Sequence, residues 1–505
     1  MSNIAIHNKN HVHLKVDAEP SIAQELNDYF SFDVPGAKFH PLYRSKMWDG
    51  KVRLYSMFTK ELYVGLIDYV RKFADEFGYT IDESNYTKYG YDVTFEEVSD
   101  FCNNLNIGSK GEPLTIREYQ LDAIYQAIVD GRRLLLSPTG SGKSLIIYCL
   151  MRWHETFGRR QLIIVPTTSL VEQMFSDFQD YSCLNQWKAV EQCHKIYSGS
   201  EKSNQYPVVI STWQSIYKLP KQFFADFHTM YGDEAHLFKA KSLTTIFNKC
   251  TNTPYRIGTT GTLDGTKTHK LILEGMFGPV FKVTTTKKLM DNNQLANLKI
   301  FAILLQYPEE VRKSVKTLKY QEEMDFLVFN EQRNKFIRNL AIYQKGNTLV
   351  LFQFVEKHGK QLYDMILNKT HDRKVFFVYG GTETAQREEI RHIVETENDA
   401  IIVASYGTFS TGINIKNLHN IIFASPSKSR IRNLQSIGRG LRLSESKMFC
   451  NLYDIGDDLS WKTRKNYTLL HMIERIKIYN DEHLDYKLAK VPLNGQAIKV
   501  KLQVP

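Results

Sequence analysis

The chain has 505 residues, enough for three or four domains, and its 42% hydrophobic and 24% charged residues exclude a disordered or fibrous protein. No run of 18 apolar residues, no signal-peptide pattern and no C-x-x-C pair among the six cysteines occurs, so we expect a cytoplasmic protein without a membrane partner or a zinc site. The net charge of +10 comes mainly from residues 110–455, which carry 45 Lys/Arg and 33 Asp/Glu, and this excess suits contact with a phosphate backbone.

Residues 1–105 form a distinct, more acidic region, for which we expect a small α+β domain. Asp49-Gly50 lies between two runs of alternating apolar residues and predicts a hairpin turn. Lys46, Lys51 and Arg53 surround this turn, with aromatic residues among them. Such a surface suits duplex or branched nucleic acid, although a purely structural hairpin would look the same. Asp49-x-Lys51 also loosely matches the D-x-K of metal nucleases, but the turn explains Asp49 better.

The stretch SPTGSGKS at residues 137–144 predicts a phosphate-binding loop between a strand (132–136) and a buried helix (145–151). Its glycines allow a tight turn and a close approach of backbone N–H groups to an anion, and the new helix adds its positive end. Lys143 reaches the β- and γ-phosphates of ATP in such loops, and Ser144 ligates Mg²⁺. Ser137 replaces the usual first glycine. The expected ATP contacts are Thr139, Gly140, Ser141, Gly142, Lys143 and Ser144.

The sequence DEAH at 233–236 supplies the second half of an ATP site. Asp233 is expected to hold Mg²⁺, and Glu234 to orient and partly deprotonate the attacking water. An isolated acidic pair is usually a solvated turn, but here a phosphate loop precedes it and the strand-and-turn RIGTTGT (256–262) follows. Two further candidates lie downstream in QSIGRGLR (435–442), where Arg439 and Arg442 are spaced to reach a γ-phosphate from another domain. The three motifs together predict an ATP-driven motor.

The motor divides into two similar halves, residues 110–285 and 286–455. Short apolar runs alternate with helical stretches in both halves, which predicts doubly wound parallel sheets buried on both faces. Only the first half has a phosphate loop, so we expect one ATP bound in a cleft between the sheets, with Arg439 and Arg442 reaching across. The expected strands are 134–136, 162–165 and 208–210 in the first half, and 348–354, 375–379, 400–405, 421–424 and 449–454 in the second.

Residues 456–505 are expected to form a helical extension. Within 460–482, apolar residues including Met472 and Tyr479 share one helical face, which predicts packing on the second motor half. Basic residues on the same segment, Arg475 among them, either contact nucleic acid or form a solvated face.

Taken together, the motifs resemble those of superfamily 2 helicases and translocases over most of residues 115–445. The resemblance rests on IREYQ (116–120), IVPTTSLVEQ (164–173), STWQS (211–215), TTGT (259–262), LFQF (351–354), SYGTFSTGINI (405–415) and QSIGRGLR. It implies two RecA-like motor domains, adenine recognition by Gln120 and a further nucleotide contact by Gln435. It also implies nucleic-acid contacts by Pro166, Thr167, Thr212, Phe354 and Thr408, and coupling of hydrolysis to movement by His236, Thr260, Thr262 and Gly412.

Two positions depart from that superfamily's pattern. Ser436 stands where the last motif often has arginine, and Asn414 stands where an acidic residue is common, which puts a ribose contact at Asn414 in doubt. Over its whole length the chain more closely resembles the UvsW family of recombination helicases of T-even-type phages, through KMWDGKVRLY (46–55), the VASYGTFSTG block (403–412) and the C-terminal extension. That resemblance implies branch migration, fork regression and R-loop unwinding, with 3′→5′ movement.

The expectation is therefore an ATP- and Mg²⁺-dependent DNA helicase or translocase that acts on branched DNA or RNA–DNA hybrids as a monomeric motor. The predicted domains are 1–105 for DNA binding, 110–285 and 286–455 for the motor, and 456–505 for the helical extension. An RNA helicase with the same motor remains an alternative. A non-enzymatic annealing or architectural protein is a second alternative, although it would not need Lys143, Glu234 and Arg442 together.

Overall fold

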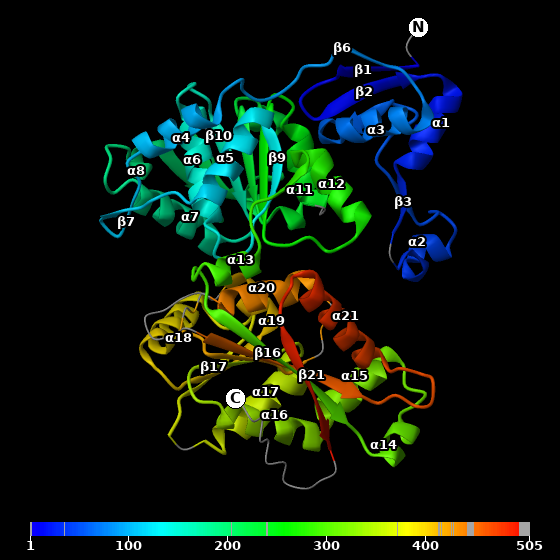
Figure 1. Cartoon of the computed structure of the whole chain (residues 1–505), viewed down its shortest axis with the longest axis vertical. Coiled ribbons are helices and arrows are strands. Elements are labelled where there is room, and N and C mark those ends of the chain that lie inside the picture. The colour runs from blue at the N-terminus through cyan, green and yellow to red at the C-terminus, as the bar shows by residue number, and fades with distance from the viewer. Residues whose placement is uncertain are drawn as a thin grey trace. The chain divides into compact units, whose positions relative to one another are not determined.

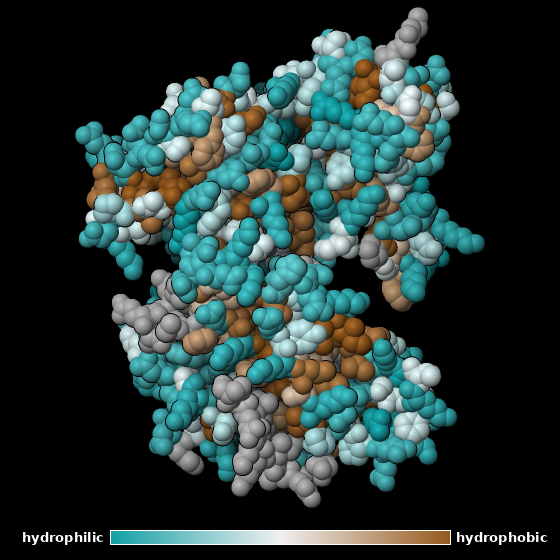
Figure 2. All heavy atoms as spheres, viewed as in Figure 1, coloured by the Kyte–Doolittle hydropathy of each residue, from teal (hydrophilic) through white to brown (hydrophobic). Residues whose placement is uncertain are grey.

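A computed structural model describes residues 3–34, 36–203, 205–238, 241–370, 372–412, 415, 417–425, 427, 429–441 and 449–493. The chain forms two compact units, the first from Met1–Ser137 with Ser141–Thr284, and the second from Thr285 onward with Pro138–Gly140 (Figure 1). Each unit has its own seven-stranded sheet. On the face seen in Figure 2, hydrophilic side chains cover most of each unit, interspersed with hydrophobic patches.

The N-terminal domain of the first unit is built on a four-stranded sheet with the order β5-β2-β1-β6. Strands β1 and β2 pair antiparallel, and β6 joins β1 in parallel. Alternate residues of β1 and β2, such as Ile6 and Leu14, are buried in a core that also includes Leu26 of α1 and Phe73 of α3. The elements are β1 (Ile4–Asn8), β2 (His13–Ala18), α1 (Pro20–Tyr29), β3 (Ser31–Asp33), η1 (Ala37–Phe39), α2 (Pro41–Arg44), β4 (Lys51–Arg53), β5 (Glu61–Tyr63), η2 (Val64–Leu66), α3 (Ile67–Phe77) and β6 (Ile81–Asn85).

The rest of the first unit is a parallel sheet with the order β11-β12-β10-β13-β14-β9-β15. Helices α4–α7 pack on one face of this sheet and α9–α12 on the other, so its central strands are buried on both sides. The elements are α4 (Phe95–Asn104), β7 (Gly108–Ser109), β8 (Glu112–Pro113), α5 (Glu118–Asp130), β9 (Arg132–Leu136), α6 (Lys143–Glu155), β10 (Gln161–Val165), α7 (Thr168–Tyr181), α8 (Ala189–Gln192), β11 (Cys193–Ile196), β12 (Val208–Thr212), α9 (Trp213–Ile216), α10 (Lys221–Phe224), β13 (Thr229–Asp233), η3 (Ala235–Leu237), α11 (Lys241–Lys249), β14 (Tyr255–Thr260), α12 (Lys267–Phe277) and β15 (Val280–Lys282).

The N-terminal domain and this sheet share core residues. Val12 belongs to the apolar core around α9–α12, while Leu271 of α12 belongs to the core of the N-terminal domain. A Cβ atom on Gly65 would lie 1.9 Å from the backbone oxygen of Glu274, so only glycine allows this approach. The Tyr69 hydroxyl also donates a hydrogen bond to the Glu274 carboxylate, at 2.7 Å. The N-terminal domain is therefore packed against α12 as part of one unit.

The second unit is a parallel sheet with the order β18-β19-β17-β20-β21-β16-β22. The two sheets confirm the expected pair of doubly wound domains, and the eight strands expected from apolar runs are all present. In the second unit two further strands were not expected, namely β16 and the edge strand β22. The elements are α13 (Thr286–Asp291), β16 (Asn297–Gln306), α14 (Glu309–Ser314), α15 (Tyr320–Phe329), α16 (Glu331–Tyr343), β17 (Thr348–Phe352), the π-helical turn η4 (Val355–Gly359), α17 (Lys360–Leu367), β18 (Val375–Val378), α18 (Thr384–Thr396), β19 (Ile401–Ser405), α19 (Tyr406–Gly412), β20 (Asn420–Phe423), α20 (Arg430–Gly440), β21 (Phe449–Asp458), α21 (Tyr467–Asp481) and β22 (Tyr486–Pro492).

The C-terminal extension contains the expected helix, α21, which begins at Tyr467 rather than near residue 460. Met472 and Tyr479 are buried as expected. Arg475 is buried too. Its Nε donates to the Asp454 carboxylate at 2.8 Å, and the Tyr479 hydroxyl donates to the same carboxylate at 2.7 Å. The interpretation of Arg475 as a nucleic-acid or solvent-facing residue is therefore wrong.

Glu323 on α15 holds the N-terminus of α21. Glu323 is 4% exposed, and its carboxylate accepts hydrogen bonds from the backbone N–H groups of Tyr467 and Thr468 and from the side chains of Asn466 and Thr468, at 2.8–3.0 Å. We expect Glu323→Ala to lower the free energy of unfolding by about 3 kcal/mol or more, since several buried donors lose their acceptor. Chemical denaturation measures this, with Glu310→Ala on exposed α14 as the control. Equal midpoints for the two variants would contradict the prediction.

Candidate functional site

The phosphate loop lies where β9 ends and α6 begins, at Lys143. Gly140 and Gly142 both have φ of +84°, a conformation that favours glycine, so the loop needs glycine at these positions. Ser137 and Ser141 are completely buried, and their hydroxyl groups hydrogen-bond to each other across the loop. The serine that replaces the usual first glycine therefore ties the two ends of the loop together.

Gln120 supports the same loop from α5. Its Nε2 donates to the Ser141 carbonyl at 2.8 Å, and its Oε1 accepts from the Arg117 backbone N–H at 3.0 Å. A Cβ atom on Gly142 would lie 2.3 Å from that Nε2, which gives Gly142 a second reason to be glycine. The structure thus brings Gln120 to the loop, and its recognition of adenine remains a prediction.

The acidic pair lies at the end of β13, two strands away from β9 in the sheet. Because parallel strands end at the same edge, Asp233 and Glu234 come close to the loop: Lys143 Nζ is 3.7 Å from Glu234 Oε1. Asp233 is 8% exposed and accepts a hydrogen bond from Thr259 Oγ1 at 2.8 Å. Burial and the neighbouring Glu234 raise the pKa of Asp233, so this carboxylate is held in a site that disfavours its charge.

The backbone of Glu234 is in the left-handed region, at φ of +51°. This conformation is costly for a residue with a side chain and is concentrated at functional sites. It places the carboxylate between two cationic or titratable partners, Lys143 and His236, whose Nδ1 is 3.3 Å from Glu234 Oε2. The geometry suits a carboxylate that acts on a water near the phosphate loop.

A chain of hydrogen bonds joins three residues that the sequence assigned to coupling. His236 Nδ1 lies 3.0 Å from Thr260 Oγ1, and Thr260 Oγ1 donates to the Thr262 carbonyl at 3.0 Å. All three side chains are buried. A displacement of Glu234 or His236 would therefore also displace Thr260 at the end of β14. Gly412, the fourth residue predicted to couple hydrolysis to movement, ends α19 in the second unit. The coupling role of all four residues remains a prediction.

Asp233 and Ser144 fit a Mg²⁺ ion by their chemistry. Both offer hard oxygen donors, which Mg²⁺ prefers, and a buried carboxylate with a raised pKa gains from a nearby cation. Ser144 is the second residue of α6, so it follows Lys143 at the positive end of that helix.

The candidate nucleic-acid contacts of the first unit lie together at the carboxyl ends of two neighbouring strands. β10 and β12 are neighbours, so Pro166 and Thr167 after β10 lie beside Thr212 at the end of β12. The Gln214 side chain donates to the Pro166 carbonyl at 3.2 Å and joins the two segments. Thr167 also caps α7, since its hydroxyl accepts from the Leu170 N–H at 3.3 Å. Contact of these strand ends with nucleic acid remains a prediction.

The candidates of the second unit lie near the ends of its strands and on α20. Phe354 follows β17, and Thr408 lies in α19, where its hydroxyl is 2.7 Å from that of Ser405. Gln435 and Arg439 lie on α20, and the approach of either residue to ATP remains a prediction. Arg442 and Asn414 lie outside the described residues.

The predicted hairpin at Asp49-Gly50 is wrong as a strand–turn–strand unit. β4 pairs antiparallel with β3, and the segment between them contains η1 and α2 instead of a second strand. The turn itself is present, because Gly50 has φ of +79° and the Asp49 carboxylate accepts from the Lys51 N–H at 3.1 Å. Asp49 also pairs with Arg53, which lowers the pKa of Asp49 to about 2. Lys46 and Lys51 are exposed, whereas Arg53 already has a carboxylate partner.

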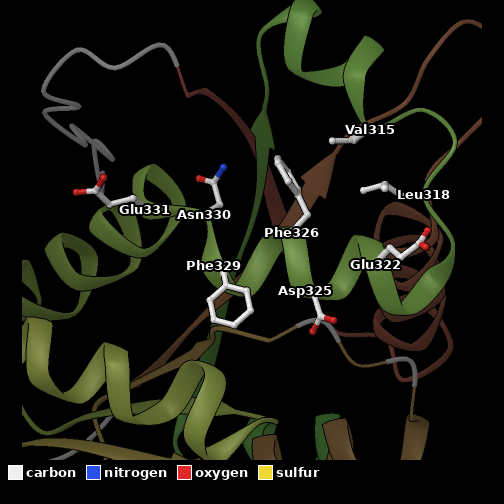
Figure 3. A pocket seen from close by; sticks show the side chains of 8 residues that line it. All are labelled: Val315, Leu318, Glu322, Asp325, Phe326, Phe329, Asn330 and Glu331. Atoms are coloured by element: carbon white, nitrogen blue, oxygen red, sulfur yellow. The ribbon is translucent and has the colours of Figure 1, made fainter.

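A separate groove of about 640 Å³ lies in the second unit (Figure 3). Phe326 and Phe329 of α15 line it, and Phe329 is 57% exposed. Among the residues that the structure describes, none of those assigned to ATP or nucleic acid lines this groove. Its lining consists of Val315, Leu318, Glu322, Asp325, Phe326, Phe329, Asn330 and Glu331.

Sequence reasoning gave no supporting role to three residues that the structure places at the predicted site. Thr259 binds Asp233, Ser137 closes the loop, and Tyr181 lies with its hydroxyl 2.9 Å from that of Ser144. Thr259 and Ser137 lie inside recognised motifs, so their hydroxyl groups were a usable signal. Tyr181 is 37 residues from Ser144 and no local pattern marks it.

Three known families match consecutive parts of the chain. The family described as "DNA helicase UvsW, N-terminal" matches residues 3–83, "Type III restriction enzyme, res subunit" matches 113–265, and "Helicase conserved C-terminal domain" matches 331–444. Among the described residues, no helix is both long and apolar enough to cross a membrane.

Individual relatives agree with these matches. The ATP-dependent DNA helicase uvsW of Enterobacteria phage T4 is 38% identical over 97% of this chain and 100% of its own length. The DNA 3′-5′ translocase XPB2 of Sulfurisphaera tokodaii is 21% identical over 71% of this chain and 86% of its own. The crystal structure of T4 UvsW covers 97% of this chain and 100% of that chain, at 35% identity and a TM-score of 0.51. The type ISP restriction-modification enzyme LlaBIII shares the fold at 16% identity and a TM-score of 0.55, over 75% of this chain and 32% of its own.

Proposed function

We propose that this chain, which belongs to the UvsW family of ATP-dependent DNA helicases, acts on branched DNA molecules. The proposed reactions are branch migration, regression of replication forks and unwinding of R-loops, in recombination, repair and replication. The observation that carries this proposal is the shared core of the N-terminal domain and the first motor sheet. A nucleic-acid surface on that domain would be held in a fixed position relative to the first motor sheet, as recognition of a branch requires.

ATP hydrolysis is assigned to the phosphate loop and the acidic pair. Lys143 and the backbone N–H groups of the loop bind the phosphates, and Gln120 reads the adenine. Glu234 orients the attacking water and accepts its proton. Lys143 Nζ lies beside the Glu234 carboxylate, so binding of ATP would draw Lys143 to the phosphates and release the carboxylate for the water.

A Mg²⁺ ion is the proposed metal of this site. Ser144 and Asp233 would hold it, and when bound it neutralises the charge that develops on the phosphates. Thr259 keeps the Asp233 carboxylate oriented through its 2.8 Å hydrogen bond.

Movement along DNA is assigned to the two motor sheets. We infer that Arg439 and Arg442 reach the γ-phosphate from the second motor domain, so that ATP draws the domains together and hydrolysis releases them. Pro166, Thr167 and Thr212 on one domain and Phe354 and Thr408 on the other would grip the strand alternately. We further propose that the motor works as a monomer in the cytoplasm of a phage-infected cell.

An RNA helicase would use the same motor, and an annealing protein would need no hydrolysis. The experiment that separates all three is an ATPase assay at fixed salt with four-way junction, forked duplex, single-stranded DNA, RNA duplex and RNA–DNA hybrid. We expect stronger stimulation by branched DNA than by linear DNA or RNA of the same length. Stimulation by RNA alone would contradict the proposal, and no turnover with any of them would indicate an annealing protein.

We expect the double variant Lys46→Ala/Lys51→Ala to reduce the preference for junctions over single-stranded DNA. Removal of one lysine–phosphate ion pair lowers the slope of log affinity against log salt by about one, so removal of both lysines would lower it by about two. Junction and single-strand titrations at several salt concentrations measure both quantities. Point variants are preferred to deletion of residues 1–105, because deletion would uncover Leu271 of the shared core.

The matched control is Lys72→Ala/Lys88→Ala, which removes the same charge from two exposed positions of the same domain. Arg53 is changed only in a separate variant, since its loss would also leave Asp49 without its ion pair. If both double variants keep the wild-type ratio of junction to single-strand affinity, the segment from Lys46 to Lys51 is structural.

A further inference from the structure

The hydroxyl groups of Ser144 and Tyr181 face each other at 2.9 Å. Ser144 lies in the first turn of α6, and Tyr181 is the last residue of α7, so two helices of the first unit bring them together. The proposed function makes Ser144 a ligand of Mg²⁺ but assigns no role to Tyr181.

Tyr181 is held firmly. Its ring packs on that of Tyr148 in α6, with 5.5 Å between ring centroids. The preceding residue, Asp180, accepts hydrogen bonds from the Ser109 hydroxyl at 2.8 Å and the Lys110 N–H at 2.6 Å, which fixes the end of α7.

A serine that ligates a cation uses an oxygen lone pair and keeps its hydrogen. That hydrogen must point away from the cation, and a fixed acceptor beside it selects the orientation that leaves the lone pair free. The Tyr181 oxygen is such an acceptor, at hydrogen-bond distance and on a rigid support. Residues that orient metal ligands in this way commonly change metal affinity by about 10–100-fold when they are replaced.

We propose that Tyr181 is a positioning residue for the metal site: it accepts the hydrogen of Ser144 and turns the serine lone pair toward the Mg²⁺ that accompanies ATP. The inference rests on the proposed role of Ser144 as a metal ligand. It predicts that the Tyr181 hydroxyl strengthens nucleotide binding when Mg²⁺ is present and has no effect on nucleotide binding without the metal.

The test is the affinity of the full chain for a fluorescent ADP analogue, measured with Mg²⁺ and again with EDTA. The affinity with Mg²⁺ divided by the affinity with EDTA gives a ratio that reports how much the metal contributes to nucleotide binding. Tyr181→Phe keeps the ring and removes only the hydroxyl, and we expect it to reduce this ratio by about 10-fold while the affinity in EDTA stays at the wild-type value. The Mg²⁺ concentration for half-maximal ATPase at fixed ATP should rise in parallel.

Tyr148→Phe is the matched control, because its hydroxyl belongs to the same aromatic cluster but accepts from Arg152 at 2.9 Å instead of facing Ser144. We expect Tyr148→Phe to keep the wild-type ratio. Tyr181→Phe should have no further effect when it is added to Ser144→Ala, since the orienting hydroxyl then has nothing to orient.

The outcomes separate this inference from the proposed function. If Ser144→Ala collapses the ratio but Tyr181→Phe keeps the wild-type value, Tyr181 only packs, and the inference is overturned while the metal site stands. A higher ratio in Tyr181→Phe would also overturn it, because Tyr181 would then hold the serine away from the metal. If Ser144→Ala itself leaves the ratio unchanged, the metal role of Ser144 fails and the inference fails with it.

Discussion

Replacing Glu234 with glutamine is expected to lower the turnover of ATP by about 10²–10⁴-fold while nucleotide still binds, because general-base catalysis contributes a factor of that size. Glutamine keeps the shape of the side chain but cannot accept the proton of the attacking water. The variant also loses the ion pair with Lys143 Nζ, which lies 3.7 Å from Glu234 Oε1. Lys143 is then free for the phosphates, so nucleotide affinity should be equal to or higher than that of the wild type.

Lys143→Ala should behave differently. It removes the cation that binds the phosphates, so both turnover and nucleotide affinity should fall. Turnover and affinity are measured separately, by steady-state ATPase and by titration with a fluorescent nucleotide. Glu172→Gln, which affects an exposed ion pair with Lys195 in the same unit, serves as the control. Substantial turnover in either Glu234→Gln or Lys143→Ala would contradict the assignment of the catalytic centre.

The second large effect is expected from the arginines of the second motor domain. Loss of an arginine that binds the γ-phosphate typically costs about 10³-fold or more in rate, because the developing charge loses its partner. We expect Arg442→Ala to show this loss and Arg439→Ala a smaller one, with nucleotide affinity changed far less than turnover. The measurements are DNA-stimulated ATPase and nucleotide titration of the same preparations.

Arg391→Ala is the control for these variants, since Arg391 bridges Glu388 and Glu395 along α18. If both Arg439→Ala and Arg442→Ala keep wild-type turnover, ATP is not bound between two motor domains in the manner proposed. A loss of affinity without a loss of kcat would instead assign the arginines to ground-state binding.

The sequence alone determined the chemistry and the layered architecture of this protein. The phosphate loop is recognisable because its glycines, its lysine and its hydroxyl lie within eight consecutive residues, and the structure gives Gly140 and Gly142 the positive φ that this loop needs. The central strands were predictable because a parallel strand buried on both faces is a continuous apolar run, as at 162–165 and 348–352. The same local logic predicted that Met472 and Tyr479 face inward.

The tertiary structure decided what depends on residues far apart in the chain. Arg475 reads as a surface cation, but Asp454 lies opposite it and both are buried. The partner of β4 is β3 rather than the adjacent segment, because strand pairing depends on which backbone is available and not on the nearest turn signal. Tyr181 reaches Ser144 only because α6 and α7 pack on the same face of the sheet. A sequence records each of these side chains, and only the fold brings its partner within hydrogen-bond distance.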